Sequence, residues 1–383
     1  MTRRQLSLRL LSITRRVLPP LAASIVARVV FLMIGVCLFA LGGWAVASLA
    51  AGTSAWSIPV IIVCAVVLSL LKGGARYLEQ FAGHFVAFHC LAMLRNYFYD
   101  QLEPQAPAGT DRLDSGDIMN RVTKDIDRVE VFFAHTLAPV TTAIIVPILT
   151  LVWMGTSVSW AVAAVLGPFL VVVGAIIPFL GSGATARAAR ELRDARGALA
   201  AHVTDSVQGV REVLAFGAQE RREAEMDDIE ARIDSGLGVQ GRWIALRRGL
   251  NQAAVAVGIV TVAMVAGSEY LGGALTLPQV GLAIGIAMGS FGPVLAVEEF
   301  AADLDQAFAS AARVFAITDR APAVADPANP VPLTPGNIVI SDVTFAYPTD
   351  EDAPAPAPTV LDGVNIRIPA GKRTAIVGAS GSG

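Results

Sequence analysis

The sequence predicts a mainly α-helical fold: a bundle of six transmembrane helices with long cytoplasmic helical extensions, followed by the start of an α/β domain that carries a phosphate-binding loop. The first observation is composition. Hydrophobic residues make up 54% of the 383 residues and charged residues 16%, and the mean hydropathy is +0.59, which is typical of a membrane protein. The second observation is a glycine-rich stretch at Gly378–Gly383. The net charge of −3 gives no basic field that would indicate nucleic acid as a partner.

Six stretches are apolar over the roughly 20 residues that a bilayer-spanning helix needs. We place these spans at Leu21–Ala47, Ile58–Leu78, Phe133–Met154, Trp160–Leu180, Leu250–Tyr270 and Pro278–Val297. The segment before them is basic and amphipathic. It does not resemble a cleavable signal peptide, because the apolar stretch that follows is long enough to span the membrane.

The loops between the spans predict the orientation. The short connectors 50–57, 155–159 and 268–277 contain no lysine or arginine, whereas the long connectors 72–132 and 181–249 contain many. Basic loops tend to stay in the cytoplasm. We therefore expect a multi-pass protein of the cytoplasmic (inner) membrane, with both long connectors and both termini in the cytoplasm.

The long connectors are predicted to be helical. Residues 187–200 and 220–233 are rich in strong helix formers, so the second to fifth spans are expected to continue as helices beyond the membrane. Helix breakers place one turn at Pro104–Ser115 and the other near Gly209–Gly217. From composition alone, solvated hairpins without a special role remain an alternative.

A change of composition predicts the domain boundary. Residues 321–336 contain five prolines and no large apolar cluster, which is typical of an extended linker. We therefore divide the chain into a basic cytoplasmic segment (1–20), a transmembrane domain with two intracellular hairpins (21–320), the linker (321–336) and the N-terminal part of a nucleotide-binding domain (337–383).

The glycine-rich stretch matches the first six positions of the phosphate-binding pattern G-x-x-x-x-G-K-[ST]. Glycines let consecutive backbone N–H groups point at the phosphates. The candidate nucleotide-binding residues are Gly378, Ala379, Ser380, Gly381, Ser382 and Gly383. The sequence ends one residue before the expected lysine. We therefore expect no catalytic residue in this stretch, and neither ATP hydrolysis nor strong ATP binding by it alone.

Polar residues inside the spans are candidates for the substrate site, because charges are costly in hydrocarbon. Arg28 lies in the first span. Arg76, Gln80 and His84 follow the second span to its cytoplasmic end, at i, i+4 and i+8 on one helix stripe, and Glu79 lies off that stripe. One interpretation is a basic inner mouth for an anionic substrate or the propionates of a haem. The other is a set of snorkelling arginines with a structural salt bridge, such as Arg28 with Glu298.

Histidine and glycine patterns allow two more predictions. A single histidine near a membrane interface is more often hydrogen-bonded filler than a ligand, and the remaining histidines show no metal-ligand spacing, so we expect no metal site. Gly281, Gly285 and Gly289 are four residues apart in the sixth span. We expect them to form a face for close helix packing.

Three segments resemble type I ABC exporters in the right order along the chain: 115–127 after the first intracellular turn, 208–217 at the second turn, and 343–348 at the opening strand of the ATPase domain. A finer resemblance is to the C subunit of CydDC-type thiol-reductant exporters. It rests on 76–79, His84 and 102–109.

This resemblance implies a half-transporter that binds ATP with Mg²⁺, with the two intracellular turns acting as coupling helices on the ATPase domains. Tyr347 stands where the family stacks an aromatic ring on adenine. A heterodimer with a related D-type subunit is expected, with a homodimer as the alternative. The implied cargo is a small thiol such as cysteine or glutathione. Export of a lipid or an amphipathic drug and a non-transporting membrane anchor or sensor are the alternatives. The resemblance also favours His84 as a haem ligand, although Gln80 replaces a residue that is often basic in that family.

Overall fold

The computed structural model describes residues 2–106, 115–133, 137–322, 329–330, 332, 336–346 and 359–378, with the side chains of 131, 298–303 and 305 excepted. The chain divides into two compact units, Met1–Ala323 and Val324–Gly383. The proposed linker 321–336 and the first predicted turn lie mostly outside the described residues.

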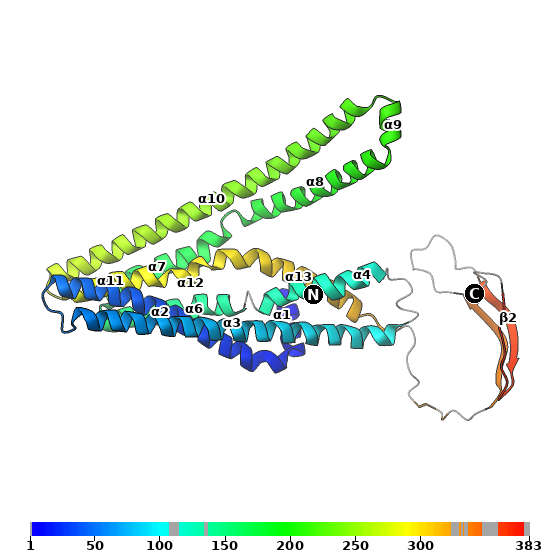
Figure 1. The fold of residues 1–383 in the computed structure, drawn as a ribbon, viewed down its shortest axis with the longest axis horizontal. Helices are drawn as coiled ribbons and strands as arrows, with labels where there is room; N and C mark the ends of the chain where they lie inside the picture. Colours follow the sequence, from blue (N-terminus) through cyan, green and yellow to red (C-terminus); the bar gives the residue numbers. More distant parts are fainter. Residues whose placement is uncertain are drawn as a thin grey trace. The chain divides into compact units, whose positions relative to one another are not determined.

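All regular elements in the described part of the first unit are helices (Figure 1). Its elements are α1 (Arg3–Ile13), η1 (Arg15–Val17), α2 (Leu18–Ala50), α3 (Ile58–Leu102), η2 (Glu103–Gln105), α4 (Ser115–Asn120), η3 (Arg121–Asp125), α5 (Ile126–Phe132), α6 (Ala138–Ser157), α7 (Trp160–Val171), η5 (Val172–Ile176), η6 (Ile177–Phe179), α8 (Ser182–Gln208), α9 (Val210–Ala215), α10 (Gln219–Leu271), α11 (Leu277–Ser290), α12 (Gly292–Leu295) and α13 (Val297–Thr318).

Six helical segments in the described residues are long and apolar enough to cross a membrane, which confirms the predicted fold class. They are Arg15–Ala50, Ile58–Gln105, Ala138–Ser157, Trp160–Gln208, Gln219–Leu271 and Leu277–Leu295. The short connectors after α2, α6 and α10 lie at one end of the bundle, which we call the connector end. There Ser159 Oγ donates a hydrogen bond to Glu269 Oε1 at 3.0 Å, and the rings of Trp44 and Trp56 meet edge to face.

The helices α8 and α10 form a long antiparallel hairpin joined by α9, which extends away from the other helices of the first unit (Figure 1). The predicted second turn is therefore a short helix between two breaks, at Gly209 and at Gly217, whose φ is +60°. Near this turn the Arg222 guanidinium donates to the backbone oxygen of His202 at 2.9 Å, and the His202 ring lies 2.9 Å from the Arg222 oxygen.

The fourth span continues into α8 of this hairpin, but with an interruption that the sequence did not predict. The π-helix η5 and the 3-10 helix η6 follow α7, and the chain then turns at Leu180 and Gly181, whose φ is +72°. A Cβ added at Gly181 would lie 2.2 Å from the Trp243 ring of α10. Glycine is needed there both for its backbone conformation and for this close contact.

The predicted glycine face of the sixth span is confirmed. Gly281, Gly285 and Gly289 of α11 pack against α2, where Cβ atoms added at them would lie 2.2 Å, 2.3 Å and 2.7 Å from α2 backbone atoms. Gly43 completes the contact from the α2 side, since a Cβ there would lie 2.1 Å from the Gly281 oxygen. Small residues thus allow two membrane helices to approach at backbone distance.

Two apolar cores hold the first unit together. One lies among α2, α6, α7, α10 and α11 and includes the fully buried Phe291 and Met154. The other lies where α1, α3, α5 and α13 meet and includes Phe98 and Phe133. The second core lies at the end of the bundle opposite the connectors.

An ionic clasp joins the N-terminal helix to the end of α13. The Arg9 guanidinium donates to both carboxylate oxygens of Asp319, one at 2.7 Å, and to Tyr97 Oη at 2.8 Å. It also lies 4.2 Å from the ring centroid of Phe315. The hydrogen bonds from Arg9 hold the pKa of Asp319 below its usual value.

The second unit contains an antiparallel pair of strands, β1 (Ile338–Ala346) and β2 (Thr359–Ile368), in which Ile338 lies opposite Ile368. The pairing is irregular at Asp342, whose φ is +51°. The backbone N–H of Asp342 donates a hydrogen bond to Asn365 Oδ1 at 2.9 Å. The described chain then runs without regular structure to Gly378.

The glycine contact predicts a sharp difference between two neighbouring substitutions. Gly43→Ala places a methyl group into the Gly281 backbone and should destabilise the protein by about 1–3 kcal/mol. Gly42→Ala is the matched control, because a Cβ there meets nothing within 4 Å. Thermal unfolding in detergent measures both. Equal melting temperatures for the two variants would contradict the packing described.

The clasp predicts a pH dependence. Because the folded-state pKa of Asp319 is lowered, its stabilising contribution is present above the unfolded-state value of about 3.9 and is lost as the pH falls through the lower folded value. Asp319→Asn should lower stability near neutral pH by less than about 1 kcal/mol, since the pair is partly exposed. Melting temperatures of the two proteins should converge on acidification. A constant difference between them down to pH about 2 would argue against the clasp.

Candidate functional site

Two features lie within the membrane-spanning helices of the first unit: a polar cluster between α2 and α3, and an apolar pocket between α6, α7, η5 and the α12–α13 junction. The polar cluster contains two of the four predicted substrate residues, Arg28 and Arg76. The apolar pocket was not predicted from the sequence.

The polar cluster is built around one carboxylate. Arg28 Nη1 lies 2.6 Å from Glu79 Oε1, and Arg76 Nη1 lies 2.5 Å from Glu79 Oε2. The Glu79 side chain is only 7% exposed, and that of Arg28 is 19% exposed. One glutamate therefore binds two arginines at the same time, one from α2 and one from its own helix.

Two further hydrogen bonds fix this arrangement. Arg28 Nε donates to Thr142 Oγ1 of α6 at 3.3 Å, and Ser24 Oγ donates to the Glu79 backbone oxygen at 3.2 Å. Three membrane helices thus meet at the cluster. The side chain of Glu298, named as an example of a structural partner for Arg28, lies outside the described residues. The described partner is Glu79, which lies off the stripe of Arg76.

Lys72 is a member of the cluster that the sequence analysis missed. Its Nζ lies 5.2 Å from the ring centroid of Phe31 on α2, and the Arg76 guanidinium carbon lies 5.3 Å from the same ring. A Cβ added at Gly35 would lie 3.3 Å from Lys72 Nζ, so the ammonium lies against the α2 backbone. The sequence spacing could have indicated it, because Lys72 lies four residues before Arg76 and so extends the same stripe.

Gln80 and His84 continue this stripe but are exposed and do not join the ion pairs. The His84 ring stacks on the Phe88 ring, with centroids 6.1 Å apart. Within the described residues there is no group of three metal-ligating side chains. An exposed imidazole with Gln80 one turn away does not form an enclosed haem site in the described part of this chain, so the haem expectation finds no support.

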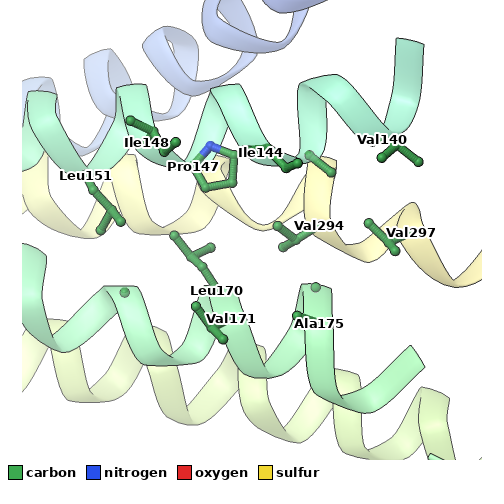
Figure 2. A pocket seen from close by; sticks show the side chains of 13 residues that line it. Val140, Ile144, Pro147, Ile148, Leu151, Leu170, Val171, Ala175, Val294 and Val297 are labelled. Carbon is green, nitrogen blue, oxygen red and sulfur yellow. The ribbon is translucent and has the colours of Figure 1, made fainter. Parts of the chain in front are cut away.

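The apolar pocket has a volume of about 380 Å³, within the range of roughly 300–1,000 Å³ for small-molecule sites. Figure 2 shows the α6 side chains facing those of α7 and η5, with Val294 and Val297 between them. The lining residues are Val140, Ala143, Ile144, Pro147, Ile148, Leu151, Gly167, Leu170, Val171, Gly174, Ala175, Val294 and Val297.

Irregular backbone shapes this pocket. Pro147 lies inside α6 and Pro168 inside α7, and each removes a helix hydrogen bond. The π-helix η5 widens the turn that carries Gly174, and π-bulges are frequent at functional sites. Ile144 and Ile148 at the rim are 60% and 55% exposed, so the pocket opens to the surface of the bundle.

The nucleotide-binding predictions mostly lie outside the described residues, which include neither Tyr347 nor Ala379–Gly383. Gly378 is described and is exposed. Its role as the first glycine of the phosphate-binding loop stays a prediction.

Comparison with known protein families identifies the membrane part of the chain. Residues 19–294 match the ABC transporter transmembrane region. This stretch includes the polar cluster and all the pocket residues except Val297.

Three curated relatives illustrate the range of similar proteins. A probable ABC transporter ATP-binding/permease protein of Haemophilus influenzae is 29% identical over 84% of this chain and 57% of its own length. The glutathione/L-cysteine transport system ATP-binding/permease protein CydC of Escherichia coli is 26% identical over 95% and 63%. An ATP-dependent lipid A-core flippase of Chromobacterium violaceum is 24% identical over 82% and 52%. The chain thus spans 52% to 63% of the length of these relatives.

The shared carboxylate predicts a non-additive pair of substitutions. Glu79→Gln leaves Arg28 and Arg76 without their carboxylate and should destabilise the protein by about 3–5 kcal/mol. Adding Arg28→Gln removes one of the two unpaired charges and should restore part of the stability. Glu191→Gln, which removes an exposed carboxylate from α8, is the matched control. Thermal unfolding of the four proteins in detergent is the measurement, and a double variant no more stable than Glu79→Gln would show that the charges are not coupled.

Proposed function

Because the chain belongs to the family of ABC transporter transmembrane regions, we propose that it is a subunit of an ATP-driven exporter. Its cargo is a small cytoplasmic thiol, cysteine or glutathione, which it moves out across the cytoplasmic membrane. In this proposal the connector end faces outward, both termini face the cytoplasm, and the hairpin of α8, α9 and α10 extends into the cytoplasm.

The main observation that supports the proposal is the tip of that hairpin (Val210–Phe216). Three apolar side chains of the tip are exposed: Phe216 by 84%, Leu214 by 61% and Val210 by 48%. Such a group of apolar side chains on a water-exposed turn is typical of a surface that binds a partner. The continuous 53-residue helix α10 behind it is a stiff lever. We assign the tip to a groove on an ATPase domain, so that nucleotide-driven movement of that domain reaches the spans.

The nucleotide part of the proposal rests on the sequence motif. The full-length protein would bind ATP with Mg²⁺ at the loop beginning at Gly378, with Tyr347 against the adenine ring. Residues 337–383 would then be the first part of the nucleotide-binding domain, joined to the membrane domain by the linker 321–336. Since six spans supply half of a twelve-helix pathway in such exporters, the subunit works as a dimer, with a D-type partner preferred to a second copy of itself.

Two observations support a thiol cargo. The relative CydC, whose name states glutathione and L-cysteine transport, aligns with 95% of this chain. The cluster of Arg28, Lys72 and Arg76 with the single carboxylate of Glu79 is a polar, net cationic place within the spans. Glutathione carries negative charge and would be attracted to it.

A specific observation also favours the second candidate, export of a lipid. The pocket lined by α6, α7, η5, α12 and α13 is aliphatic, and none of its thirteen described lining residues is aromatic or charged. Such a pocket fits a hydrocarbon chain better than a small polar thiol. Lipid A-core flippases are among the relatives at 24% identity. A non-transporting anchor or sensor has no comparable support.

Transport by the full-length protein, assembled with its partner in inverted membrane vesicles, tests the proposal. We expect ATP-dependent uptake of radiolabelled glutathione or cysteine, and no ATP-dependent movement of a fluorescent lipid between leaflets. The reverse result would select the lipid alternative, and the absence of both would select the anchor or sensor.

The tip variant Phe216→Ser should lower this uptake about tenfold or more, because loss of the apolar anchor uncouples the ATPase domain from the spans. Leu237→Ser on the shaft of α10, a residue 44% exposed, is the matched control and should transport normally. Equal uptake by the two variants would remove the tip from the coupling mechanism.

A further inference from the structure

We propose that Lys72 and Arg76, side by side on the Phe31 ring, form a binding site for the anionic group of the transported molecule, a carboxylate or a phosphate. This deepens the proposed export function and rests on it. The site is distinct from the ion pair of Arg28, whose guanidinium is held by Glu79 and Thr142.

Lys72 lies at the depth of the hydrocarbon layer. Lys72 lies 14 residues after Ile58, the first residue of α3 at the connector end, which is about 21 Å along the helix. Arg28 lies 22 residues before Ala50, the last residue of α2, which is about 33 Å from the same end. Since the hydrocarbon layer is about 30 Å thick, Lys72 lies inside it, whereas Arg28 lies at its inner boundary.

The cluster contains more positive than negative charge. Among the described side chains, the cluster has three cations and one carboxylate, Glu79, which is bound by Arg28 on one oxygen and by Arg76 on the other. In the part of the chain that the structure describes, Lys72 has no carboxylate partner. The Phe31 ring, 5.2 Å away, is the group that the structure places at its ammonium. A cation–π contact stabilises an ammonium less than an ion pair in hydrocarbon does. Among the described side chains the cluster therefore carries two more positive than negative charges.

The site is accessible to a ligand from the cytoplasmic end of α3. Arg76 is 43% exposed although one of its nitrogens is bonded to Glu79, so further N–H donors of its guanidinium remain available. Gln80 and His84 continue the same stripe of α3 and are exposed. At 1.5 Å per residue from Ile58, Gln80 and His84 lie about 33 Å and 39 Å from the connector end, at and beyond the inner boundary, where water is present. The stripe from His84 to Lys72 therefore leads from this boundary to the Lys72 ammonium.

The chemistry of the site follows from its donors. An ammonium offers three N–H donors and a guanidinium a planar fork, a combination that suits carboxylate or phosphate oxygens. The site discriminates by charge, so esterification of the carboxylates of a cargo should abolish its recognition. A carboxylate would come from a cytoplasmic thiol such as glutathione, and a phosphate from a lipid headgroup.

The experiment measures binding to the full-length complex in nanodiscs. The probes are tritiated glutathione, its diethyl ester, which has no free carboxylate, and tritiated phosphatidylglycerol. Lys72→Met should weaken glutathione binding about tenfold, the loss expected for one charge-assisted hydrogen bond. Lys72→Arg keeps the charge and should bind within about threefold of the parent. Arg232→Gln removes an exposed cation from α10 and is the matched control, with no change expected.

Each outcome decides a separate point. Diethyl ester binding that is weak in the parent and unchanged by Lys72→Met supports recognition of the carboxylates. If phosphatidylglycerol binding depends on Lys72 and glutathione binding does not, the anion site stands and the thiol cargo is wrong. If Lys72→Met binds both anionic probes as the parent does, while melting normally and transporting thiols, the anion site is overturned and the export function stands.

Discussion

A bilayer offers no water to a free backbone N–H or C=O, and this constraint governs the architecture of the first unit. Its apolar segments must form hydrogen-bonded helices, and a helix can be interrupted only where other protein atoms surround the break. The interruptions after α7 follow this rule. Gly181 lies under the Trp243 ring of α10, and Arg247 of the same helix donates a hydrogen bond to the Leu180 oxygen at 3.3 Å. The same irregular stretch opens the pocket that favours a hydrocarbon chain.

The bilayer also constrains where charged side chains can lie. A carboxylate in low-dielectric surroundings must be paired, and Glu79 is paired twice. Arg28 fixes α2 against α3 through this carboxylate, and Thr142 adds α6 to the contact. Both oxygens of that carboxylate bind arginines, so the ammonium of Lys72, one turn before Arg76 on α3, lies against the Phe31 ring instead. A structural ion pair and a candidate anion site thus arise from the same cluster, which contains more positive than negative charge.

At the opposite end of the bundle from the connectors, α13 is the element to which other parts of the first unit attach. Asp125 of the π-helix η3 accepts hydrogen bonds from Arg313 Nε at 2.9 Å and from Ser310 Oγ at 3.1 Å. Burial raises the pKa of Asp125, but the hydrogen bonds from Arg313 and Ser310 and the charges of Arg313 and Arg121 together outweigh burial and leave the pKa lowered. Arg9 holds the residue that follows α13. In the exporter that we propose, the segment after the first coupling turn and the N-terminal helix would therefore move together with α13, the helix that leads to the ATPase domain.

The sequence by itself determined the number of spans, the mainly helical class and the glycine face of the sixth span, because each depends on local composition or on a fixed spacing along one helix. It also placed Arg76, Gln80 and His84 on one stripe. Only the tertiary structure decided that Arg28 pairs with Glu79, 51 residues away and off that stripe, that Lys72 shares the Phe31 ring with Arg76, and that the fourth span breaks at Gly181. Such contacts depend on how each helix is rotated and how closely it approaches its neighbours, and the periodicity of a single helix does not contain that information.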